Sequence, residues 1–358
     1  MKLENYRGRK AASIENDTLR VTVLAGGGHV AGILHKPTGV DPLWKPHWPS
    51  IEPSSYGRKT HLQYGASDEA IILSGIMGHS ICLDTYGKPS PEEFAAGVPV
   101  HGEGPTVDYT LEIESQSLIA TGILPLAELA FQREIRLHRD GERIQFVETL
   151  QNLSSSDRPI AWTQHVTLGP PFLEAGQTQF RASVTKSKSA GPDFGDGQSA
   201  QAPDCEFEGL ACPRKGGGTI DLRVFPDERV SGGFTSHLID PQRDDAFFAA
   251  WSPASWVLFG YIWKRQDFPW LCRWEENHLR ADPPWSKKTL ACGMEFGKTP
   301  VLGSRRSLVE LGTMFGTAAY GWIPAKSHLR VEYWAFVRTA PSIPENVRWD
   351  ADGGLRFE

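Results

Sequence analysis

Short segments in which apolar and polar residues alternate recur along the whole chain, and they predict β-strands. Four such segments lie in the first half, at residues 18–24, 107–113, 132–137 and 143–150, and five further strand candidates lie in the second half, at 219–225, 246–251, 256–263, 271–275 and 329–337. An Asp-Gly turn at 140–141 joins two of them, so residues 132–168 are predicted to form a β meander. No long helical periodicity accompanies them, and the pattern favours an all-β protein.

Composition strengthens this interpretation. The 36 glycines and 26 prolines are spread through the chain and interrupt it often, as many short strands require. Large β sandwiches often exceed the average domain length, so residues 1–358 are predicted to form a single domain. The Gly- and Ser-rich stretch 187–212 is predicted to be a surface excursion, and the segment after Pro341 an irregular or edge segment.

Charge and cysteine content narrow the class of partner. With 37 basic and 43 acidic residues the net charge is -6, which repels nucleic acid and anionic membranes and favours a small-molecule partner. Neither a signal-peptide core nor a membrane-spanning run is evident, so a cytoplasmic protein is expected. The five cysteines are odd in number and lack CxxC pairs, which favours neither a disulfide framework nor a thiolate zinc site.

Three acid-base residues stand out, each in a β-type context: His101, His165 and Glu295. Two imidazoles and a carboxylate that meet in a β fold could take a proton from one sugar oxygen and return it to another. The structural alternative is that each histidine is a buried residue with satisfied hydrogen bonds and that Glu295 caps the end of a strand.

The residues around these three positions resemble the aldose 1-epimerase, or galactose mutarotase-like, superfamily. The resemblance rests on the opening segment 14–28 with its Gly26-Gly-Gly28 turn, on His101-Gly-Glu, on the turn and strand at 152–165, and on the Gly-x-Glu segment that ends at Glu295. It covers most of the chain. It implies a β-supersandwich whose concave face binds a sugar.

The resemblance also implies a role for each residue. Glu295 would be the general base on the anomeric hydroxyl, and His165 the general acid on the ring oxygen. His101 would hydrogen-bond the anomeric region and stabilise developing charge. No metal and no organic cofactor would be needed. The ligand would be a monosaccharide or a sugar phosphate, bound by a monomer or a homodimer.

Six further residues are predicted to bind the substrate. The indoles could stack on a pyranose, Arg58 could replace an arginine that the family carries upstream, and the other three are polar residues that line the site or order a nearby loop. They are Arg58, His79, Asp84, Glu103, Trp162 and Trp274.

Two alternatives stay open from the sequence. A metal-dependent, cupin-like isomerase could draw ligands from His79, Asp84, His101, Glu103 and His165, although none of the 11 histidines forms a His-x-His pair. A non-catalytic carbohydrate-binding protein of the same fold is the other alternative.

Overall fold

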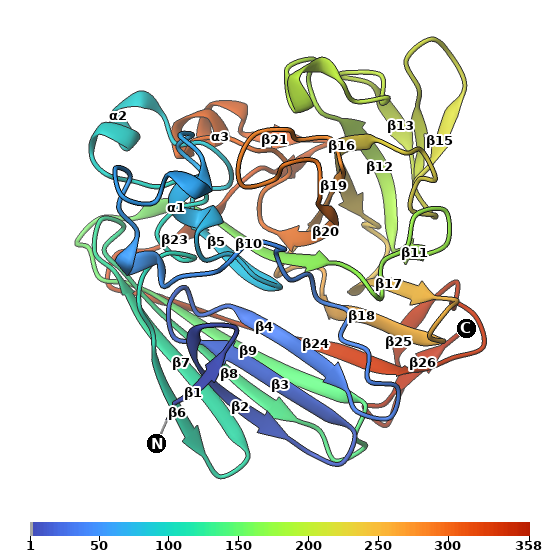
Figure 1. The fold of residues 1–358 in the computed structure, drawn as a ribbon, viewed down its shortest axis with the longest axis horizontal. Coiled ribbons are helices and arrows are strands. Elements are labelled where there is room, and N and C mark those ends of the chain that lie inside the picture. Colours follow the sequence, from blue (N-terminus) through green and yellow to red (C-terminus); the bar gives the residue numbers. More distant parts are fainter. Residues whose placement is uncertain (1–2) are drawn as a thin grey trace.

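The computed structural model describes residues 3–358, and two antiparallel sheets dominate it (Figure 1). Met1 and Lys2, which the predicted single domain includes, lie outside the described residues. The larger sheet has twelve strands, with β23 (Gly321–Ile323) paired to the outer end of β10. Its other strands, in sheet order, are β1 (Glu4–Tyr6), β2 (Arg9–Glu15), β3 (Leu19–Leu24), β4 (Val30–His35), β5 (His79–Asp84), β10 (Arg158–Leu168), β20 (Leu290–Gly297), β19 (Trp270–Asn277), β16 (Ser231–Ile239), β12 (Val184–Ser189) and β13 (Glu206–Glu208).

The second sheet has eight strands, and the remaining elements are short. In sheet order its strands are β11 (Gln179–Ala182), β17 (Asp245–Ser252), β18 (Val257–Lys264), β24 (His328–Thr339), β9 (Arg143–Asn152), β8 (Leu129–Leu137), β7 (Ser117–Leu124) and β6 (Thr110–Glu114). Three hairpins pair β14 (Ala211–Pro213) with β15 (Thr219–Asp221), β21 (Thr313–Met314) with β22 (Thr317–Ala318), and β25 (Val347–Trp349) with β26 (Leu355–Phe357). The helices are α1 (Ala70–Leu73), α2 (Pro91–Ala95) and α3 (Arg305–Leu311), with 3-10 turns η1 (Pro53–Ser55), η2 (Leu62–Tyr64) and η3 (Phe194–Gly197). The all-β prediction is confirmed.

The two sheets pack face to face through aromatic side chains. Phe296 of the larger sheet lies 5.4 Å from Tyr261 and 5.3 Å from Tyr333 of the smaller sheet, measured between ring centroids. All three rings are buried in the main hydrophobic core. Because successive side chains of a strand point to opposite faces, the other face of the larger sheet is left to carry a site.

A buried polar network crosses this core. Arg133 pairs with Glu148 at 2.7 Å, and both side chains are fully buried. Gln164 of β10 accepts a hydrogen bond from Arg133 at 2.8 Å and donates one to Glu148 at 2.6 Å. Burying a charged side chain is costly unless it is paired with an opposite charge and hydrogen-bonded. Here Arg133 and Glu148 are paired with each other, and Gln164 forms a hydrogen bond with each of them. The network therefore fixes β10 from its inner side.

Three local predictions need correction. Residues 132–168 do not form one meander, because β10 leaves β9 and joins the larger sheet between β5 and β20. The stretch 187–212 is only partly an excursion, since β12 and β13 form the edge of that sheet. The C-terminal segment is ordered as the β25–β26 hairpin, which packs against β17 and β18 through Val347.

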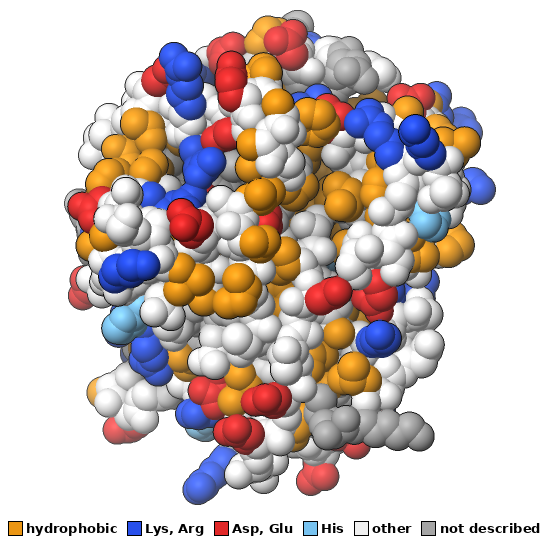
Figure 2. All heavy atoms as spheres, turned by 90° about the vertical axis from the view of Figure 1, so that its left-hand side faces the viewer, with side chains coloured by type: hydrophobic (Ala, Val, Ile, Leu, Met, Phe, Trp, Pro, Cys, Tyr) orange, Lys and Arg blue, Asp and Glu red, His pale blue; other side chains and the backbone are white. Residues whose placement is uncertain are grey.

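The helices α1, α2 and α3 gather near β5 and β23, far from the β25–β26 hairpin (Figure 1). Within residues 3–358, no helix is long and apolar enough to cross a membrane. Figure 2 shows one face of the molecule, on which acidic, basic and hydrophobic side chains are interspersed.

Candidate functional site

The register of two neighbouring strands brings His165 and Glu295 together. His165 of β10 lies directly opposite Glu295 of β20, so their side chains share the outer face of the larger sheet. His165 Nε2 is 3.3 Å from Glu295 Oε1, and the two side chains are only 9% and 2% exposed. An imidazole and a carboxylate from segments 130 positions apart thus form one acid-base pair.

The second oxygen of Glu295 is also occupied. Tyr86, which follows β5, donates a hydrogen bond from its hydroxyl to Glu295 Oε2 at 2.5 Å. Burial raises the pKa of Glu295, while His165 and the Tyr86 hydrogen bond oppose that rise. A carboxylate with a raised pKa is a stronger base, closer to the pH at which a cell works.

A glycine makes the room for this carboxylate. Gly293 lies two residues before Glu295 on the same face of β20, and a methyl group added there would sit 2.2 Å from Glu295 Oε1. Any larger residue would compete with the carboxylate for the same space. The Gly-x-Glu spacing that the sequence shows therefore has a steric reason.

His101 reaches the pair from a turn and not from a strand, contrary to the β-type context that we expected. Its backbone has φ 63°, and its N–H donates to Gly87 O at 2.9 Å. Its ring centroid lies 5.5 Å from that of His165, with the rings edge to face. The three predicted catalytic residues are therefore close together.

The hydrogen bonds of His101 define its tautomer. The Gly87 N–H donates to His101 Nδ1 at 3.2 Å, and the Cys82 sulfur lies 3.2 Å from the same nitrogen. Burial, followed by the charges of His165 and Arg280, lowers the pKa of His101 to about 3. The ring is thus neutral at neutral pH, and because Nδ1 accepts, Nε2 carries the proton and can donate to a ligand oxygen.

Trp274 forms a flat wall beside this cluster. It lies on β19 opposite Gly293, and its ring centroid is 6.3 Å from that of His165. The guanidinium of Arg280 lies over it at 5.6 Å and over Trp285 at 4.7 Å. The half-buried Trp274 is thus placed where an indole could stack on a sugar ring, as the sequence predicted; the contact itself stays a prediction.

Two of the predicted substrate-binding residues lie on the wrong face of the sheet. His79 and Trp162 are fully buried between the sheets. Both nitrogens of His79 are engaged, by Tyr261 at 2.9 Å and Gln164 at 3.0 Å, and the Trp162 indole donates to Glu148 at 3.1 Å. The alternation of side chains along β5 and β10 points both residues away from His165, so we correct these two predictions.

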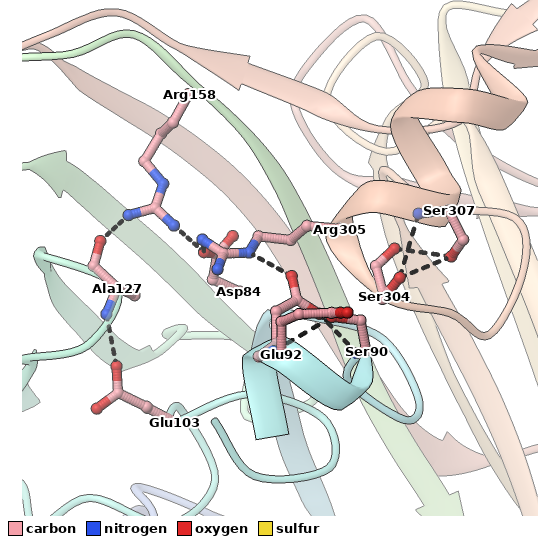
Figure 3. A network of polar contacts seen from close by, with 10 residues as sticks. Asp84, Ser90, Glu92, Glu103, Ala127, Arg158, Ser304, Arg305 and Ser307 are labelled. Carbon is pink, nitrogen blue, oxygen red and sulfur yellow. Dashed lines mark hydrogen bonds and ion pairs between the residues drawn. The ribbon is translucent and has the colours of Figure 1, made fainter. Parts of the chain in front are cut away.

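Asp84 and Glu103 belong to a separate polar network, in which Arg158 and Ala127 lie between them (Figure 3). Asp84 is held by Arg158 and by Arg305, the latter at 3.1 Å, and Glu103 accepts a hydrogen bond from the Ala127 N–H at 2.7 Å. Burial raises the pKa of Asp84 to about 7 against the lowering effect of both arginines. Asp84 and Glu103 both line one small hollow, and their contact with a sugar stays a prediction.

Arg58 is not part of either group. It lies in the loop after η1, its side chain is 59% exposed, and it donates to Ala66 O at 3.0 Å. The structure instead places Arg280 beside Trp274. The sequence reasoning missed both Arg280 and Tyr86, because neither lies in a motif and both depend on contacts between distant segments.

The described residues offer no set of metal ligands of the kind that the cupin-like alternative requires. Within residues 3–358, no group of three or more His, Cys, Asp or Glu side chains could hold a metal ion. His79 faces the core, and Asp84 is held by two arginines, which explains why the five candidate ligands do not converge.

Comparison with known proteins identifies the fold of this chain. No protein-family model matches the chain, and no curated protein sequence matches it. Among solved structures, a putative aldose 1-epimerase from Klebsiella pneumoniae matches with a TM-score of 0.67 and 14% identity, over 95% of this chain and 83% of that one. A galactose mutarotase-like protein from Clostridium acetobutylicum matches with a TM-score of 0.62 and 11% identity, over 95% and 98% of the two chains.

A galactose mutarotase related enzyme from Lactobacillus acidophilus matches with a TM-score of 0.57 and 10% identity, over 92% of this chain and 97% of that one. The similarity therefore spans 92–95% of this chain and 83–98% of the three others, at identities that establish the fold and not the activity. At the level of the fold, the resemblance expected from the sequence is confirmed: the chain has the galactose mutarotase-like fold.

Proposed function

We propose that this protein is an aldose 1-epimerase-like isomerase that interconverts the α and β anomers of a monosaccharide. The observation that carries the proposal is the His165–Glu295 pair at 3.3 Å, with His101 beside it. The anomeric hydroxyl and the ring oxygen of an aldose are bonded to the same carbon. An acid and a base that serve them together must therefore be close neighbours, as these two side chains are.

In the proposed reaction, Glu295 removes the proton of the anomeric hydroxyl while His165 protonates the ring oxygen. The bond between C1 and the ring oxygen breaks, and C1 becomes a free aldehyde. After rotation about the C1–C2 bond, the ring oxygen attacks the other face of C1, and the two protons return. The N–H at Nε2 of His101 donates to the oxygen that gains charge.

The fold similarity supports this proposal, since relatives described as putative aldose 1-epimerases and mutarotase-like proteins share the architecture. A free or a phosphorylated aldose as substrate, a monomer or homodimer as the active form, and the cytoplasm as its location belong to the same proposal.

NMR exchange spectroscopy between α and β anomers, over a panel of free and phosphorylated aldoses, tests the proposal. The wild type should accelerate exchange of at least one sugar, and Glu295→Gln should lower that rate about 10²- to 10⁴-fold, the usual worth of a general base. Glu112→Gln, on the exposed face of β6, is the control and should keep the full rate. Line broadening of a sugar without any exchange would contradict the enzyme proposal and favour a carbohydrate-binding protein.

A further inference from the structure

The contact between Tyr86 and Glu295 carries an inference beyond the three expected residues. Tyr86 is fully buried, and its hydroxyl donates to Glu295 Oε2 while Glu295 Oε1 faces His165 Nε2. We infer that Tyr86 is the positioning residue of the base: it holds one oxygen of the Glu295 carboxylate so that the other is presented to the sugar. This inference rests on the proposed function, because it assigns Tyr86 a part in the same reaction.

The main chain around Tyr86 is anchored on both sides. The Gly303 N–H donates to Tyr86 O at 2.5 Å, just before α3, and the His101 N–H donates to Gly87 O. Two residues before Tyr86, Asp84 forms ion pairs with Arg305 from α3 and with Arg158 from β10 (Figure 3). The main chain that carries Tyr86 is therefore held in place by contacts to three other segments.

The aromatic ring of Tyr86 is also held, by close packing against other side chains. It lies 6.2 Å from Phe234 and 5.9 Å from His101, between ring centroids, in a buried cluster that also contains Leu308. Burial, together with the nearby Cys272 and Glu295, raises the pKa of Tyr86 well above its ordinary value. The phenol thus stays protonated over the working pH range, and it can only donate to the carboxylate.

The other groups near Glu295 do not replace this hydrogen bond. The titratable side chains around it are His165 from β10, Cys82 from β5, Cys272 from β19 and, three residues earlier on its own strand, Cys292. Burial raises the pKa of all three thiols, so they are neutral at neutral pH. Only Tyr86 donates to Oε2 among the described contacts, and it thereby stabilises the charged form of the carboxylate.

Tyr86→Phe tests the inference, since it removes one hydroxyl and keeps the ring that packs on Phe234. We expect kcat for anomer exchange to fall about tenfold to a hundredfold with little change in KM, because the base is misplaced while the walls of the site remain. The acid limb of the pH profile should move to higher pH by about one unit, because the carboxylate loses a donor. Tyr64→Phe is the matched control, since the buried Tyr64 hydroxyl donates to Pro49 O at 2.9 Å, away from Glu295.

A second measurement is independent of activity. In protein labelled with ¹³C at the glutamate carboxyl carbons, the Glu295 signal is identified by its loss in Glu295→Gln, and its titration midpoint should rise in Tyr86→Phe. An unchanged midpoint, or an unchanged kcat and acid limb in a folded variant, overturns the inference. A wild type without exchange activity contradicts the proposed function instead, while the titration still decides whether Tyr86 controls Glu295.

Discussion

Gly293→Ala is the most direct test of how the site is built. The added methyl would lie 2.2 Å from Glu295 Oε1, 3.1 Å from Glu295 Cδ and 3.2 Å from Trp274 Cβ, whereas ordinary contact begins at 3.4 Å. The carboxylate therefore has to move by about 1 Å, a displacement that costs about a hundredfold in rate when it separates a catalytic group from its substrate. Overpacking of this kind also destabilises a fold by about 1–3 kcal/mol.

The assay is anomer exchange by NMR, with a thermal melt of the same samples. Gly293→Ala should be folded, with a lowered melting temperature and a rate reduced about a hundredfold. Gly191→Ala is the control, because a methyl there would meet only the Asp204 carboxylate, at 3.6 Å. A folded Gly293→Ala variant with the wild-type rate would refute the argument that Gly293 reserves the space of the carboxylate.

Further predictions concern the wall of the site and the buried histidines. Trp274→Ala should raise KM about tenfold through loss of stacking on the sugar. Trp322→Ala, at a side chain that is 51% exposed, is the control and should leave KM unchanged. A Trp274→Ala variant with the wild-type KM would show that Trp274 is not part of the sugar site. Burial lowers the pKa of His29 and of His237 to about 3. Below pH 6.5, these two imidazoles are therefore protonated in the unfolded chain but stay neutral in the folded protein. The free energy of unfolding in guanidinium should therefore fall as the pH drops from about 6.5 towards 3, by about 2 kcal/mol per histidine at pH 5, and equal values at pH 7 and pH 5 would contradict this.

Local alternation was enough to predict several of the longer strands. Residues 143–150 lie within β9, where buried and less buried positions alternate over most of the strand, and a period of two records that directly. Residues 246–251 lie within β17, which is buried on both faces and is marked by its apolar content instead. The same pattern did not reveal that β10 crosses to the other sheet, since a strand alternates in the same way whichever sheet it joins. Residues 219–225 show a further limit, because only Thr219–Asp221 is strand and the rest turns back towards β11.

The site was predictable only in part, for reasons of register and distance. His165 and Glu295 could be singled out, but their pairing depends on the alignment of β10 with β20. Trp162 could have been excluded from the sequence, because it lies three positions before His165, and side chains an odd number of positions apart on a strand point to opposite faces. Tyr86 had no such signal, because its role comes from a contact 209 residues away.

The buried network behind β10 has a consequence for how the protein moves. Gln164, next to His165, is tied to Arg133 and Glu148 on the inner side of the sheet, so the amides of β10 should be among the last in the chain to exchange with deuterium. The frame behind β10 should therefore hold His165 in the same position whether or not a ligand is bound.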